Sequence, residues 1–152
     1  MSGLAIRPPA GTSHAHLDMS GVPGLRITTP RVDMTGSGES GVTRAHRDPM
    51  FRQSYLSYYS GAYCGDLPAD HPGCSPLFAD LRGLPPLLIQ VGSEEVLYSD
   101  AERLFHAAQA AGVDATFECY DGLWHAFQLF VGFLPESTEA INEIGKFLRR
   151  HF

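Results

Sequence analysis

The chain has 152 residues, which is enough for one domain with a hydrophobic core, and its 43% hydrophobic and 18% charged residues are typical of a globular protein. The formal net charge of −6, without a basic cluster, argues against nucleic acid as a partner. Every apolar run is far shorter than a membrane span, and the start MSGLAIRPPAG lacks the features of a signal peptide, so we expect a cytoplasmic protein. Three cysteines without a CxxC pair favour buried thiols over a disulfide framework or a zinc site.

The N-terminal third shows little hydrophobic period. Residues 1–24 are rich in Gly, Pro, Ser and Thr, which predicts a loop-like or disordered leader. Residues 25–34, LRITTPRVDM, are predicted to begin as a strand, which Pro30 limits. Residues 36–41 have a turn-like composition. We therefore expect the folded part of the chain to begin near residue 25.

An aromatic-rich segment follows. Residues 51–63, FRQSYLSYYSGAY, are predicted to form a helix that begins after Asp48-Pro49 and ends at or soon after Gly61. The sequence LPADHPGCSP that comes next is predicted to be a loop.

The last seventy residues are patterned more clearly. Residues 86–92, PLLIQVG, are a short apolar run that predicts a strand buried on both faces. Ser99 and Glu102 have the spacing of a capping box at the start of a helix, which Gly112 is expected to stop. Residues 115–120, ATFECY, are predicted to be a second strand.

A final helix is predicted after Pro135. Its apolar face would consist of five residues: Ala140, Ile141, Ile144, Phe147 and Leu148. The order strand, helix, strand, helix predicts a parallel sheet with right-handed crossovers, and therefore an α/β fold.

Titratable residues follow both predicted strands. Glu94 and Glu95 come after the first strand, and His125 follows the second in YDGLWHAFQLF. The separation from Glu94 to His125 is 125 − 94 = 31 residues, about the length of one βαβ unit. Because ligands bind beyond the carboxyl ends of parallel strands, these side chains could meet there, with a carboxylate orienting the imidazole. A solvated glutamate and a hydrogen-bonded surface histidine remain the alternative interpretation.

Several stretches carry a resemblance to a known family. SPLFADLRGLPPLLIQVGSEEVLYSDA and YDGLWHAFQLFVGFLPES, with RVDMTGSGES upstream, resemble the C-terminal part of bacterial esterases of the hormone-sensitive-lipase-like family, on the α/β-hydrolase fold. The resemblance implies a partial α/β-hydrolase domain over residues 25–152, with His125 as the catalytic base and Glu94 as the acid. Glu95 and Asp100 remain alternative acids.

The resemblance also has implications for the substrate and the pocket. About residues 36–80 would be an insertion lining an acyl pocket, although simple core packing of the aromatic helix explains its composition equally well. The reaction would be hydrolysis of a short or medium acyl ester, without a cofactor or metal.

The nucleophile of such an enzyme has no counterpart in this sequence. The family places a serine in a G-x-S-x-G turn between a strand and a helix, and no serine here has glycine both two before and two after it. Ser13 keeps Gly11 but has Ala15, and RPPA precedes it where a buried strand is required. An HGGG-type oxyanion loop is absent from the sequence too. We therefore expect this chain alone to be inactive. The alternative function is an inactive remnant, or an interaction fragment that binds a partner through an exposed sheet edge, and the same edge could allow the chain to self-associate.

One further motif lies in the leader. TSHAHLDMSGVPGL resembles the HxHxDH signature of metallo-β-lactamase-fold hydrolases through His14, His16 and Asp18. Met19 stands where the signature continues, and RPPAG replaces the preceding hydrophobic strand. We therefore do not expect a metal site here.

Overall fold

The computed structural model describes residues 38–68 and 70–151. Their elements are, in order, α1 (Ser40–Thr43), α2 (Gln53–Cys64), η1 (Pro76–Phe78), β1 (Leu87–Gly92), α3 (Tyr98–Ala110), β2 (Ala115–Tyr120), η2 (Phe127–Phe130) and α4 (Pro135–His151). The leader at 1–24, its His14, His16 and Asp18 motif, and the strand expected near 25–29 lie outside the described residues.

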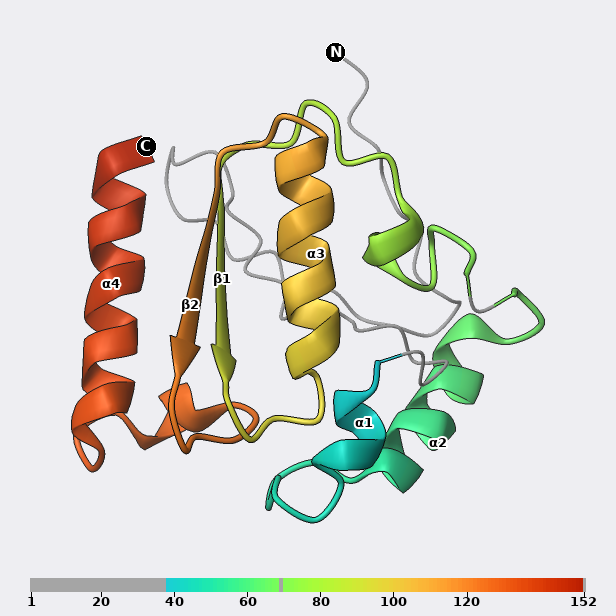
Figure 1. Cartoon of the computed structure of the whole chain (residues 1–152), viewed down its shortest axis with the longest axis horizontal. Coiled ribbons are helices and arrows are strands. Elements are labelled where there is room, and N and C mark those ends of the chain that lie inside the picture. Colours follow the sequence, from blue (N-terminus) through green and yellow to red (C-terminus); the bar gives the residue numbers. More distant parts are fainter. Residues whose placement is uncertain (1–37, 69, 152) are drawn as a thin grey trace.

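The two described strands form the predicted parallel pair. β1 and β2 run in register from Leu87 opposite Ala115 to Gly92 opposite Tyr120. The connecting helix α3 packs on one face of the sheet and α4 lies on the other, as Figure 1 shows. The parallel sheet and the βαβ connection inferred from sequence are thereby confirmed, and both strands end on the same side of the molecule.

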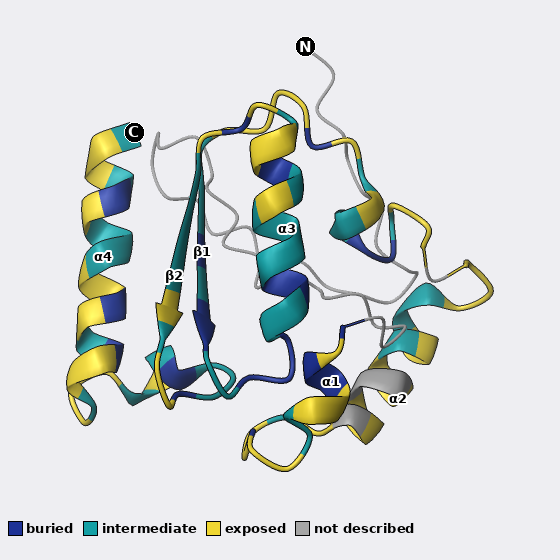
Figure 2. Ribbon diagram, in the orientation of Figure 1, coloured by how far each residue is buried: buried dark blue, intermediate teal, exposed yellow. Residues whose placement is uncertain are grey.

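The core lies mainly between the sheet and α3. Ile89 and Val91 point toward this helix and are buried against Ala101. On the opposite face of β1, Leu88 and Gln90 are only half-buried, and Gln90 donates a hydrogen bond to the carbonyl of Ala140 in α4. The expectation of a strand with two buried apolar faces was therefore wrong for the α4 side. Figure 2 shows the buried residues on the inward sides of the elements.

The start of α3 differs from the prediction. Its N-terminal cap position, Leu97, makes no side-chain cap, and the Ser99–Glu102 capping box is not formed. Instead, the backbone N–H of Ser99 donates to Oγ of Ser40 at 3.0 Å, and Ser40 Oγ donates to the carbonyl of Val96 at 2.7 Å. A residue distant in sequence thus caps the helix, which local spacing cannot reveal.

The end of α3 agrees with the prediction. Gly112 has a φ of +78°, a left-handed conformation that glycine adopts without steric cost. The N–H of Val113 donates to the carbonyl of Ala108, and that of Gly112 donates to Gln109, which together form a Schellman motif. This turn directs the chain into β2.

The other two long helices depart from the expected pattern in detail. α2 begins at Gln53 and continues past Gly61 to Cys64, so Phe51 precedes the helix. In α4, Ala140 and Phe147 are buried, but Ile141 is 41% exposed. Ile141 follows Ala140 by one position, so it lies about 100° around the helix at the edge of the buried stripe.

The cysteines are not uniformly buried. Cys74 is buried and Cys64 is half-buried, whereas Cys119 is exposed. The prediction of buried thiols is therefore correct for Cys74 and wrong for Cys119. Within the described ranges, none of the helices combines the length and apolarity required to cross a bilayer.

Candidate active site

Two loops meet beyond the carboxyl ends of the strands. The N–H of Ser93 donates to the carbonyl of Tyr120, and the N–H of Glu94 donates to that of Leu123, both at 2.9 Å. A Cβ added at Gly92 would lie 2.2 Å from the Leu123 carbonyl oxygen, so any larger residue would force the loops apart. The sheet and this glycine therefore hold the segment after β1 against the segment after β2.

His125 is paired with Glu95 at this junction. Nδ1 of His125 lies 2.7 Å from Oε1 of Glu95, and the other carboxylate oxygen accepts the N–H of Gly92 at 3.2 Å. Glu95 is buried, while the His125 side chain remains 19% exposed. Both oxygens of the acid are thus engaged, which fixes the carboxylate relative to the sheet and aims it at the imidazole.

The pairing determines which imidazole nitrogen is available for chemistry. An ionised Glu95 can only accept, so Nδ1 carries the proton and donates it, leaving Nε2 with a free lone pair. The side chains that the structure describes make no hydrogen bond to Nε2. Burial lowers the pKa of His125, but the hydrogen bond and charge of Glu95 and the charge of Asp48 outweigh it, so the net pKa is raised above 6.5. The arrangement can accept a proton at Nε2 and stabilise the imidazolium that results.

The other two candidate acids lie elsewhere. Glu94 forms an ion pair with Arg47, with Oε2 at 3.1 Å from the guanidinium, so the contact expected of Glu94 is made by its neighbour. Asp100 is buried in the first turn of α3, where Arg103 is 3.7 Å away. The loops after β1 and β2 meet, as the spacing predicted. The spacing could not choose between adjacent residues, because the turn after β1 decides which carboxylate faces inward.

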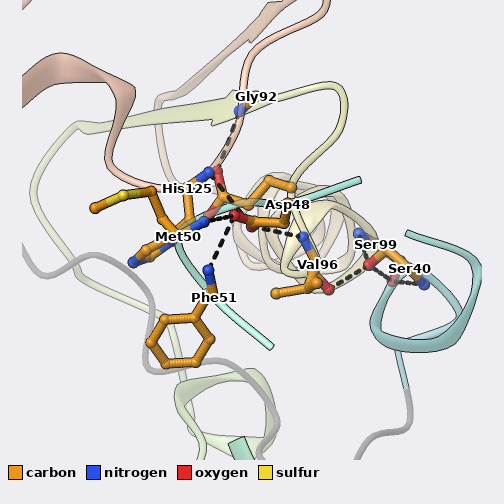
Figure 3. A network of polar contacts seen from close by, with 9 residues as sticks. Ser40, Asp48, Met50, Phe51, Gly92, Val96, Ser99 and His125 are labelled. Carbon is orange, nitrogen blue, oxygen red and sulfur yellow. Dashed lines mark hydrogen bonds and ion pairs between the residues drawn. The ribbon is translucent and has the colours of Figure 1, made fainter. Parts of the chain in front are cut away.

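Asp48 is a site residue that the sequence analysis did not identify. Its buried carboxylate accepts four backbone N–H groups, as Figure 3 shows: those of Met50 and Phe51 on Oδ1, and those of Val96 and His125 on Oδ2. The local signal was present, since aspartate before a helix commonly binds backbone N–H groups a few residues ahead. Its contacts with Val96 and His125, 48 and 77 residues away, had no such signal.

An aromatic side chain packs beside the imidazole. The ring of Phe51 lies 5.0 Å from that of His125, and Phe51 also contacts Tyr55 and Tyr59 of α2. Both tyrosines are exposed, as is Tyr58, at 72%. These tyrosines of α2 therefore do not form a buried core.

The residue after His125 has an unusual backbone. Ala126 has φ +58° and ψ +28°, the left-handed region that costs a non-glycine residue about 1–2 kcal/mol. This conformation turns the chain from His125 into η2, where Phe127 is fully buried and its carbonyl accepts the hydroxyl of Ser137 at 2.7 Å. Packing of Phe127 therefore holds the strained turn that presents the histidine.

Comparison with known proteins places these features in a family. The sequence profile described as the alpha/beta hydrolase fold matches residues 12–129. The chain belongs to that family. It is 41% identical over 121 residues to an acetyl-hydrolase of Streptomyces hygroscopicus, covering 80% of this chain and 40% of the relative. It is 36% identical over 128 residues to an esterase of Acinetobacter venetianus, covering 82% and 41%.

Solved structures agree with the sequence comparison. A crystal structure of an esterase from the bacterial hormone-sensitive lipase family superposes with a TM-score of 0.76 at 45% identity, over 79% of this chain and 40% of that one. An esterase/lipase from an uncultured bacterium gives 0.76 at 41% identity, over 81% and 41%. The family resemblance and the partial α/β-hydrolase fold inferred from sequence are confirmed, and the chain spans about two fifths of the length of these relatives.

The site offers no evident metal centre. In the part of the chain that the structure describes, there is no group of three or more His, Cys, Asp and Glu side chains placed to bind a metal ion.

Proposed function

We propose that the chain supplies the base and the orienting carboxylate of a serine-type carboxylic ester hydrolase, with His125 and Glu95 in these roles. One observation carries the proposal: Nδ1 of His125 is 2.7 Å from Glu95, which leaves Nε2 as the proton acceptor. The esterases and acetyl-hydrolase among the relatives support the reaction class.

The chemistry follows from the positions of the protons. Nε2 removes the proton of a serine hydroxyl as that oxygen attacks the ester carbonyl, and it then returns the proton to the departing alcohol. Glu95 holds the ring in the required tautomer and stabilises its protonated form, while remaining ionised itself. In this proposal a short or medium acyl group would contact the aromatic side chain of Phe51, which packs against Tyr55 and Tyr59.

The serine and the oxyanion donors must come from outside this sequence, because it contains neither G-x-S-x-G nor HGGG. The test is to mix the chain with a polypeptide carrying both motifs and to measure hydrolysis of a short p-nitrophenyl ester. We expect the mixture to be active, His125→Ala to abolish that activity, and His106→Ala, at an exposed position on α3, to leave it unchanged. A mixture in which His125→Ala is as active as the unaltered chain would contradict the proposal.

A non-catalytic interaction fragment is the second candidate. The observation in its favour is a group of exposed apolar side chains, Leu129, Val131 and Phe133, of which Phe133 is 87% exposed. Exposed apolar groups of this kind often mark contact surfaces. If no complementing polypeptide restores hydrolysis while the chain binds a partner through these residues, this second function is favoured.

A further inference from the structure

Asp48 has an unusual environment for a carboxylate. It is only 4% exposed, and within residues 38–68 and 70–151 no lysine or arginine forms an ion pair with it. Its charge is instead satisfied by four backbone N–H groups, at distances of 3.0 to 3.3 Å. A buried charge is tolerated only when such donors satisfy it, so the position of the carboxylate is closely tied to the segments that supply them.

These donors come from three separate segments. Oδ1 binds Met50 and Phe51, just ahead of α2. Oδ2 binds the N–H of Val96, the residue after Glu95, and also the N–H of His125 itself. Oδ2 of Asp48 therefore connects the backbone just after Glu95 to the backbone of His125 (Figure 3).

The same carboxylate also fixes the backbone of Phe51, the aromatic residue beside His125. By fixing the N–H of Phe51, Asp48 holds the ring whose centroid lies 5.0 Å from that of His125. The charged groups that face the imidazole are Glu95, in direct contact, and Asp48. Asp48 is thus bonded to the residue after Glu95, to His125 itself and to the residue whose ring packs beside the imidazole.

We infer that Asp48 is a positioning residue of the proposed hydrolase: it holds His125 and Glu95 at the separation their hydrogen bond requires, without touching substrate. The inference rests on the proposed function, but the contacts from which it is argued are the hydrogen bonds of Asp48. An asparagine here would retain one acceptor oxygen and would turn an NH₂ group toward backbone N–H donors, so it would disrupt part of the arrangement while keeping the side-chain shape.

The test is NMR spectroscopy of the 152-residue chain. We expect Asp48→Asn to lower the imidazole pKa of His125 and to weaken or remove the low-field resonance of the Nδ1 proton shared with Glu95. Ser40→Ala is the matched control, because Ser40 is buried and bonds the same loop through the Val96 carbonyl but makes no contact with His125. Both variants should melt at a lower temperature, and only Asp48→Asn should change the imidazole pKa and the Nδ1 proton resonance of His125.

A folded Asp48→Asn chain with an unchanged imidazole pKa and Nδ1 proton would overturn the inference. If that variant does not fold, the unaltered chain decides the question through scalar couplings across hydrogen bonds. Couplings from the amide nitrogens of Val96 and His125 to the Asp48 carboxyl carbon support the inference, and their absence overturns it. If the unaltered chain shows no low-field Nδ1 proton resonance, this would instead contradict the Glu95 pairing, and with it the proposed function.

Discussion

Glu95 and not Glu94 contacts the imidazole of His125, with 2.7 Å between Oε1 and Nδ1. The two glutamates are adjacent, yet Glu94 forms an ion pair with Arg47 on the surface. The backbone turn after β1 therefore separates two chemically identical side chains, and it gives matched variants for testing the site.

Gly92 is expected to be indispensable to this junction. A methyl group there would lie 2.2 Å from the Leu123 carbonyl oxygen, so Gly92→Ala should push the two loops apart and lower the free energy of unfolding by about 1–3 kcal/mol, as overpacking does. Gly61→Ala is the control, because Gly61 is inside α2 and a methyl group there would have no described atom from outside the helix backbone within 4 Å. It should raise stability by about 0.5–1 kcal/mol through helix propensity. Urea unfolding of both variants measures the difference, and equal effects would contradict this explanation.

The sequence predicted the parts of the fold that depend on local patterns. The hydrophobic run at 86–92 and the β-rich ATFECY predicted both strands, because strands in a covered sheet are rich in apolar and β-branched residues. The cap of α3 was predicted wrongly because Ser40 reaches it from outside the helix. Asp48 was missed for the same physical reason: its partners at Val96 and His125 are brought near only by the completed fold.

The cysteines should differ in reactivity. Burial, together with the hydrogen bond that its S–H donates to Cys64 and the charge of that group, raises the pKa of the Cys74 thiol to about 11, so almost no thiolate exists at neutral pH. We expect iodoacetamide to modify the exposed Cys119 well before Cys74, as followed by peptide mass spectrometry. In denaturant the difference should disappear. Equal rates in the native chain would show that the loop around Cys74 is open to solvent.

Because its sequence contains no G-x-S-x-G turn, the chain alone should lack an activated serine nucleophile. We expect a fluorophosphonate probe to label no serine, and ester hydrolysis to remain at the level of the His125→Ala variant. A covalent adduct on Ser13, or on any other serine, would contradict this prediction and identify the nucleophile.

The isolated chain should expose apolar surface. We expect it to self-associate and to bind a hydrophobic dye, and Phe133→Ser to reduce dye binding with little change in melting temperature because Phe133 is 87% exposed. Phe127→Ala is the contrasting variant: this ring is fully buried, so its loss should cost about 3–5 kcal/mol. A monodisperse chain that binds no dye would contradict the prediction.

The Glu95 pair should also make stability depend on pH. Because the pKa of His125 is raised in the folded chain, the pair's stabilisation is fully present below the unfolded value of 6.5 and is lost as pH rises through the folded value. The difference in unfolding free energy between the unaltered chain and Glu95→Gln should therefore be larger just below pH 6.5 than well above it. Chemical denaturation at a series of pH values measures this, and a difference that grows with pH would have the wrong sign.

The most direct test of the Glu95–His125 pairing is an NMR titration of the His125 imidazole in three chains: unaltered, Glu95→Gln and Glu94→Gln. Each substitution removes one negative charge, and the two positions are adjacent. They differ chiefly in that the carboxylate of Glu95 contacts Nδ1 and that of Glu94 does not. We expect Glu95→Gln to lower the imidazole pKa and to weaken or shift the low-field Nδ1 proton resonance, because a neutral amide oxygen replaces the carboxylate, while Glu94→Gln should leave both unchanged. The reverse result, with Glu94→Gln lowering the pKa and Glu95→Gln without effect, would contradict the assignment of Glu95 as the residue that orients the base.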